Sequence, residues 1–208
     1  MGDHPVGNRW GAHLEVQWRR SGILEPQQLL LRPAVNFRIN PSLELSSGYA
    51  YIATSRYGEV PAPNPFPEHR LHQQFIIQDR VGKATLLHRT RLEERWIAVR
   101  TRLPDGSLRT EDWRYQNRLR YLLRGVVPVN SDWYIAASNE IYLNLPPAHG
   151  AKFFDQNRAF AGIGRTIARA TRLEVGYLQQ TLLQRNARVL EFNHTAQVTI
   201  FSNLPFRR

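Results

Sequence analysis

The chain has 208 residues, which is long enough for one domain with a sizeable core. Its 28 Lys and Arg residues exceed its 17 Asp and Glu residues and give a formal charge of +11, carried almost wholly by arginine because Lys83 and Lys152 are the two lysines. There is no cysteine, which excludes disulfides, thiolate catalysis and cysteine metal sites, and no apolar run approaches the ~20 residues of a membrane-spanning helix.

The first predicted element, residues 10–19, alternates between apolar and polar side chains, which is typical of a β-strand. Trp10 and Trp18 share its apolar face. At about 3.3 Å per residue they lie roughly 26 Å apart, close to the height of the apolar band of an outer-membrane β-barrel. Their positions fit two rings of interfacial aromatics, whereas in a soluble barrel the same pair would lie in the core.

The same alternation predicts further strands along the rest of the chain. They cover residues 28–39, 43–54, 70–78, 86–96, 115–124, 133–144, 154–167, 172–184 and 189–201. Pro33, inside the first of these, cannot donate to a sheet ladder. The total is about ten strands of roughly a dozen residues, which is longer than the five or six residues usual in soluble sheets.

The predicted connections alternate in length. Tight turns are expected at residues 40–42, 79–83 and 168–171, a more open break at 21–26, and long loops at 56–69, 102–112 and 145–153. Such alternation is typical of up-and-down barrels in the outer membrane, where an even number of strands returns both termini to the periplasmic side. The last hairpin, at residues 184–188, departs from the rule because it is short.

These patterns together predict an all-β fold, an antiparallel up-and-down transmembrane β-barrel of about ten strands. Residues 1–9 would form an N-terminal periplasmic tail, and residues 10–206 a single barrel domain. The N-terminal residues carry neither the charged start nor the apolar segment of a signal peptide. Either a signal peptide has been removed or the protein stays in the cytoplasm, and the barrel prediction requires the first.

Two predicted strands, residues 86–96 and 115–124, carry arginines on one face and leucines and aromatics on the other. A soluble protein would bury the apolar face, whereas a membrane barrel turns it to lipid and turns the polar face to its lumen. The predicted lumen residues are Glu15, Arg89, Arg91, Glu93, Arg95, Arg118, Arg120, Glu140, Arg158 and Glu174. The predicted membrane-interface aromatics are Trp10, Trp18, Trp96, Trp113 and Trp133.

In a barrel of this width the lumen residues would most simply fill the interior with ion pairs and hydrogen bonds. Arginines outnumber glutamates among them. The alternative is therefore a narrow anion-selective path, or a pocket for a ligand that bears phosphate or carboxylate.

A soluble alternative is also open at this point. This alternative is a soluble basic protein, either a β-barrel or an α+β protein. Residues 92–103 place four apolar side chains at helical spacing, and a helix there would favour the α+β form. The charge of +11 and the Trp-Arg-Tyr sequence at residues 113–115 would then suit nucleic acid. Strands are favoured over helices here, so no nucleic-acid partner is expected.

Signals of catalysis are weak, because the chain has no Gly-x-Ser-x-Gly, Walker loop or His-Glu-x-x-His motif. On a strand, His69 and His72 point to opposite faces and do not form a metal pair, and Glu93 and Glu94 likewise point apart. We expect no enzyme, no catalytic residue, no metal and no cofactor.

The remaining enzymatic alternative is an outer-membrane lipid hydrolase, in which His194 would act with Ser138 or Ser202.

Several motifs along the chain are similar to those of one known family. They are Trp18, residues 30–33 (Leu-Leu-Arg-Pro), 48–49 (Gly-Tyr), 89–93 (Arg-Thr-Arg-Leu-Glu), 118–121 (Arg-Leu-Arg-Tyr), 139–140 (Asn-Glu), 154–158 (Phe-Asp-Gln-Asn-Arg) with Gly162, and 173–178 (Leu-Glu-Val-Gly-Tyr-Leu). Over about residues 10–201 the chain resembles the bacterial outer-membrane β-barrel family known as domain-of-unknown-function family 2490. It differs from such barrels in ending on Arg207-Arg208 rather than on an aromatic residue.

The resemblance implies a secreted outer-membrane barrel without an established activity. We therefore expect a Gram-negative outer-membrane protein with an arginine-rich, largely filled lumen and a structural or narrow anion or small-solute transport role. Its expected partners are outer-membrane lipid or lipopolysaccharide and the barrel-assembly machinery, and its oligomeric state is open.

Overall fold

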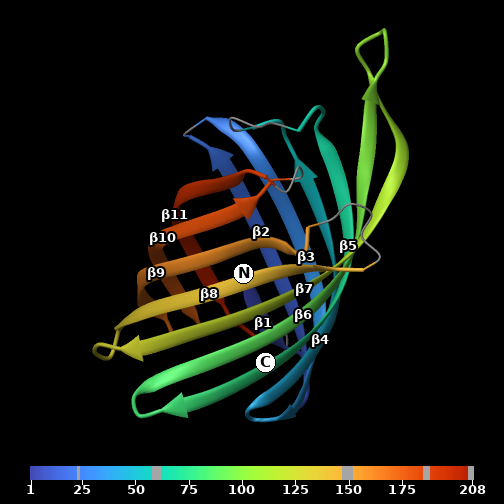
Figure 1. The fold of residues 1–208 in the computed structure, drawn as a ribbon. Coiled ribbons are helices and arrows are strands. Elements are labelled where there is room, and N and C mark those ends of the chain that lie inside the picture. The colour runs from blue at the N-terminus through green and yellow to red at the C-terminus, as the bar shows by residue number, and fades with distance from the viewer. Residues whose placement is uncertain (23, 58–61, 147–151, 185–187, 206–208) are drawn as a thin grey trace.

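The computed structural model of the chain describes residues 1–22, 24–57, 62–146, 152–184 and 188–205. Within these residues eleven strands form one sheet, in which each strand pairs with its neighbours in sequence (Figure 1). The strands are β1 (Gly2–Pro5), β2 (Trp10–Ser21), β3 (Glu25–Asn40), β4 (Leu43–Thr54), β5 (Phe66–Val81), β6 (Ala84–Arg102), β7 (Leu108–Pro128), β8 (Trp133–Leu145), β9 (Phe154–Ala168), β10 (Thr171–Leu183) and β11 (Leu190–Ser202). All ladders between sequence neighbours are antiparallel, and the sheet curls around an interior (Figure 1).

The alternation of the sequence decides which side chains face the interior. In β8 the inward residues Tyr134 and Tyr142 are buried, whereas the outward residues Trp133 and Ile135 are exposed. The same pattern holds along the arginine strand β6, which is extended and not helical. The described residues contain no helix, so the helical interpretation of residues 92–103 is wrong.

The β6–β7 hairpin extends beyond the rest of the sheet (Figure 1). We expected a loop over residues 102–112, but the two strands stay paired up to Arg102 and Leu108. The turn between them is held by Leu103 and Gly106, whose backbone groups bond within the turn, and by the Asp105 carboxylate, which accepts the Ser107 N–H at 2.8 Å. Bonding from Ser107 also holds the pKa of Asp105 below its ordinary value.

The other predicted connections are close to those observed, with shifted ends. The expected loop at residues 56–69 ends earlier, because β5 begins at Phe66 and its first residues pair with β4. Gly22 and Gly82 have positive φ in their turns, a conformation that favours glycine. Residues 58–61, 147–151 and 185–187 of the expected loops lie outside the described residues.

The two ends of the sheet meet at the N-terminus. The Met1 ammonium donates to Ile200 O at 2.7 Å, and Ser202 N–H donates to Met1 O at 3.0 Å. This is the bonding pattern of a parallel bridge between Met1, just before β1, and Phe201 of β11. In the described part of the chain this contact spans only the last residues of β11, and no ladder joins β11 to β2. Residues 2–5, expected to belong to a tail, therefore form a strand that helps close the sheet.

Small residues allow large side chains to fit inside the wall. The Tyr134 ring lies against Gly164, and the Phe160 ring lies against Gly162 and Gly176. A Cβ atom at any of these glycines would collide with the ring. A second apolar cluster consists of Leu30, Ala50 and Ile52. Glycine at such strand positions marks a close approach that other residues do not permit.

Gly48 offers a test of this packing. A Cβ atom at Gly48 would lie 2.4 Å from the Ala34 Cβ and 2.4 Å from the Pro33 carbonyl oxygen, where the β3–β4 ladder is interrupted. We expect Gly48→Ala to lower the free energy of unfolding by about 1–3 kcal/mol through overpacking, measured as a lower urea midpoint. Gly125→Ala is the control, because its Cβ would meet only the flexible Leu86 side chain at 3.6 Å.

Candidate functional site

The structure buries, wholly or in part, the ten residues predicted to share one interior. Eight of them are buried: Glu15, Arg91, Glu93, Arg95, Arg118, Arg120, Glu140 and Glu174. Arg89 and Arg158 are partly buried on the same side. The contrast with the outer wall is large, since Arg91 is 1% exposed and Trp18 is 69% exposed.

The Glu93 cluster, in which Glu93 of β6 lies among Arg70, Arg91, Arg118 and Arg120, is the centre of this arrangement. Each oxygen of the Glu93 carboxylate accepts one guanidinium of β7, Oε2 from Arg118 and Oε1 from Arg120, both at 2.5 Å. Arg70 and Arg91 approach the same carboxylate at 3.7 and 3.8 Å. One carboxylate thus faces four cations on three neighbouring strands.

Glu140 of β8 extends the cluster to the next strand. It accepts Arg120 Nη2 and Arg89 Nη2, each at 2.8 Å, and the Tyr142 hydroxyl at 2.8 Å. The Tyr142 ring lies under three guanidiniums, with Arg120 closest at 4.3 Å from the ring centroid. Cation–π contacts of this kind add to the ion pairs where water is excluded.

Sequence reasoning missed an important carboxylate. Glu68 accepts Arg70 Nε and Arg95 Nε at 2.5 Å each, yet it was placed in the expected loop at residues 56–69. The alternation of Glu68, Arg70, His72 and Gln74 in β5 could have revealed it. Further ion-pair residues that were missed include Arg70, which pairs with Glu68, and Arg32, which pairs with Glu15. Arg124, which pairs with Glu174, and Asp155, which pairs with Arg118, were also missed.

Arg91 of β6 and His72 of β5 lie beside Glu93 and carry buried nitrogens without a bonding partner among the described residues. Arg91 donates from Nε and Nη2 to the Gln74 amide oxygen at 2.8 and 2.6 Å. Within the described residues, Arg91 Nη1 and both ring nitrogens of His72 have no hydrogen-bond partner, although all are buried. The unpaired Arg91 N–H groups suit an anion or water, whereas a neutral His72 ring offers one donor and one acceptor.

The inner face of β11 differs from this charged region. Its inward side chains, Glu191, Asn193, Thr195, Gln197 and Thr199, are partly or fully exposed. They bond along the strand, from the Asn193 amide to Glu191 and from the Gln197 amide to Thr199. The interior therefore has a buried, charged part that runs from β2 to β10 and an accessible part on β11 lined by amides and hydroxyls.

The five tryptophans all lie on the outer wall. Trp10 packs on Phe37 with ring centroids 4.8 Å apart, and Trp96 packs on Tyr115 at 5.3 Å. Trp10 begins β2, and Trp18 lies near its other end. Trp113 and Trp133 are also exposed.

Several polar groups on the outer wall bond to one another. The Asn139 and Asn157 amides exchange hydrogen bonds at 3.0 and 2.9 Å. Three tyrosine–histidine pairs join neighbouring strands, namely Tyr49–His69, His88–Tyr121 and Tyr177–His194. Mutual bonding lowers the cost of placing such groups in apolar surroundings.

The structure does not bring the residues of the hydrolase alternative together. His194 faces outward and bonds Tyr177, whereas Ser138 faces inward, and Ser202 lies at the other end of β11. His69 and His72 lie on opposite faces as expected. In the described part of the chain no three His, Asp or Glu side chains are grouped to hold a metal ion. The described residues also contain no helix that is long and apolar enough to cross a membrane.

Comparison with known proteins gives three matches. Residues 1–191 match the family described as "Protein of unknown function (DUF2490)". An uncharacterized protein of Methylorubrum extorquens is 30% identical over 204 residues, covering 90% of this chain and 78% of that protein. A solved structure of the NanC porin is similar in fold, with a TM-score of 0.56 and 12% identity over 97% of this chain and 90% of that chain.

Proposed function

The chain belongs to the DUF2490 family, and we propose that it is a bacterial outer-membrane β-barrel whose interior is largely filled by arginine–carboxylate ion pairs. The proposal rests on one observation, the inverted distribution of polar and apolar side chains across the wall. The porin-like fold supports it.

Energetics favour this arrangement only in a non-polar solvent. Burying an ion costs several kcal/mol even after relaxation. At the same time, the outer wall exposes large apolar side chains such as Trp18, Val175 and Phe192. In water, turning such a wall outward would give up roughly 25 cal/mol for each Å² of apolar surface left exposed. In lipid the same surface has no cost, and the charged side chains belong inside.

A soluble nucleic-acid-binding role is not favoured. The arginines that would contact phosphates, such as Arg91, Arg118 and Arg120, are buried and bonded to Glu93, Glu140 or Gln74. Phosphate contacts need accessible cations.

The membrane proposal is tested by solubility and by gel migration. We expect the protein to require detergent and to migrate differently in unheated and heated gels, because an outer-membrane barrel resists detergent unfolding. Solubility without detergent, together with a single gel position, would contradict it.

A narrow polar path is the transport role that the structure favours, because the inner face of β11 is accessible while the Glu93 cluster fills the opposite side. We expect the refolded protein to show a small conductance in planar bilayers. Glu191→Lys should raise the permeability ratio of anions to cations, because it places a cation on this accessible face.

Glu111→Lys is the control for that measurement, since Glu111 bonds Arg109 on the exposed β6–β7 hairpin. A silent bilayer, or equal selectivity in all three proteins, would remove the transport role and leave a structural one.

A further inference from the structure

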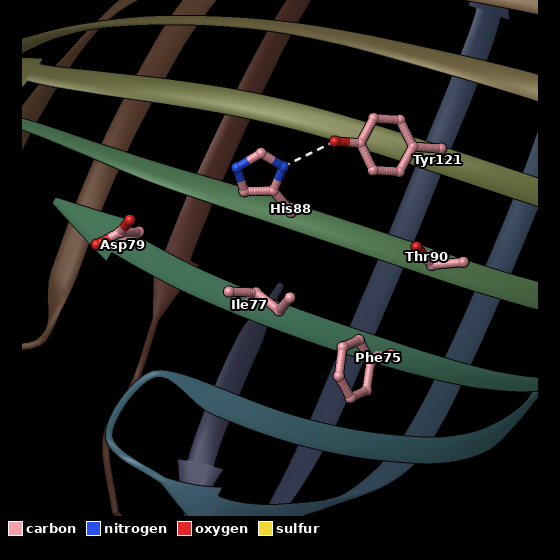
Figure 2. A pocket seen from close by; sticks show the side chains of 6 residues that line it. All are labelled: Phe75, Ile77, Asp79, His88, Thr90 and Tyr121. Carbon is pink, nitrogen blue, oxygen red and sulfur yellow. Dashed lines mark hydrogen bonds between the residues drawn. The ribbon is translucent and has the colours of Figure 1, made fainter. Parts of the chain in front are cut away.

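A groove on the outer wall lies apart from the interior charges. It has a volume of about 350 Å³ and is formed by three neighbouring strands near the Gly82–Lys83 turn. Figure 2 shows its lining: Phe75, Ile77 and Asp79 of β5, His88 and Thr90 of β6, and Tyr121 of β7. Sites for small ligands typically have volumes of about 300–1,000 Å³.

The polar groups of the groove have a definite arrangement. His88 Nδ1 and the Tyr121 hydroxyl are 2.7 Å apart, drawn as the dashed line in Figure 2. A neutral imidazole that accepts the hydroxyl hydrogen at Nδ1 carries its own hydrogen on Nε2, which makes Nε2 a donor. Asp79 Oδ1 accepts the backbone N–H of the next residue, Arg80, at 2.7 Å.

Polarity changes along the groove in the way that it changes along a lipid. Asp79 lies closest to the turn, followed by Ile77 and then Phe75 along β5. Phe75, Ile77 and Tyr121 are each about 40% exposed, so their apolar surface is available to a ligand. A donor and a carboxylate thus lie toward the turn end of an apolar channel.

We propose that this groove binds a phospholipid with an ethanolamine headgroup, an inference that rests on the proposed membrane location. The headgroup ammonium lies beside Asp79, and His88 Nε2–H donates to the phosphate. One acyl chain follows Phe75, Ile77 and Tyr121 toward the middle of the wall.

Asp79 sets the choice of headgroup. A phosphatidylglycerol headgroup has a phosphate but no cation, so it would meet the Asp79 carboxylate without compensation. An exposed ion pair contributes modestly, so we expect a preference for ethanolamine of about threefold.

The test is native mass spectrometry of the full chain, purified in detergent and titrated with phosphatidylethanolamine or phosphatidylglycerol of identical acyl chains. The wild type should retain about three times more phosphatidylethanolamine. Asp79→Asn should abolish this preference, and His88→Leu should reduce retention of both lipids. Asp132→Asn, which removes a carboxylate at the β7–β8 turn outside the groove, should behave as the wild type.

Equal retention of the two lipids by the wild type, or a preference that survives Asp79→Asn, would overturn the inference. Gel migration of every variant, heated and unheated, shows whether it is folded. A folded protein that requires detergent but lacks the preference refutes the groove alone. A protein that is soluble without detergent refutes the proposed function as well.

Discussion

Glu93→Gln should lower the free energy of unfolding by about 3–5 kcal/mol, the cost of removing one partner from a buried ion-pair network. The substitution keeps the size of the side chain but leaves Arg70, Arg91, Arg118 and Arg120 around a neutral amide. These guanidiniums cannot reach water by a change of rotamer, because Arg91, Arg118 and Arg120 are at most 5% exposed. Urea titration of the protein in lipid vesicles, followed by the unheated gel band, measures the loss.

The neighbouring residue provides the control. Glu94 belongs to the same strand but faces the outer wall, so Glu94→Gln changes the net charge equally without touching the cluster. We expect it to leave the urea midpoint unchanged or raise it slightly. Equal losses in the two variants would mean that the Glu93 cluster does not stabilise the fold.

Val175→Arg should cost about 2–4 kcal/mol in a bilayer, as cations do on the lipid face of outer-membrane barrels. Val175 is 50% exposed on β10 and lies between Ile163 and Val198 on the adjacent strands, so its surroundings on the outer wall are apolar. In water the same surface substitution would change stability by about 0.5 kcal/mol or less. The measurement therefore reports which solvent the wall faces.

Val129→Arg is the matched control, because Val129 is similarly exposed but lies in the β7–β8 turn. The urea midpoint of the Val129→Arg variant should change little in vesicles. If the two arginine variants unfold at the same urea concentration, the outer wall faces water and the proposed location is wrong.

The sequence predicted which face of each long strand points inward, because alternation is a local property with a period of two residues. Arg91, Arg118 and Glu174, which the alternation assigns to the polar face, are buried. The partners could not be predicted, because they depend on register and curvature. Arg95 and Glu68 are 27 positions apart, and Arg89 and Glu140 are 51 positions apart.

The errors have physical causes. β1 was missed because four residues are too few to display alternation, and its Pro5 resembles a break. The length of the loop predicted at residues 102–112 was overestimated. Its turn-forming residues hide the alternation of the paired strands on both sides. Glu68 was lost for a related reason, since the proline-rich loop before it continues directly into β5.

The bridge at Met1 has a consequence for the order of assembly. Every antiparallel ladder joins strands that follow one another in the chain, so the wall can grow one hairpin at a time with small entropic penalties. Met1 and Ile200 are separated by 199 positions, so their union requires the first and last parts of the polypeptide to find each other. We expect the wall to be built before it is joined, and this seam to open first when the protein unfolds.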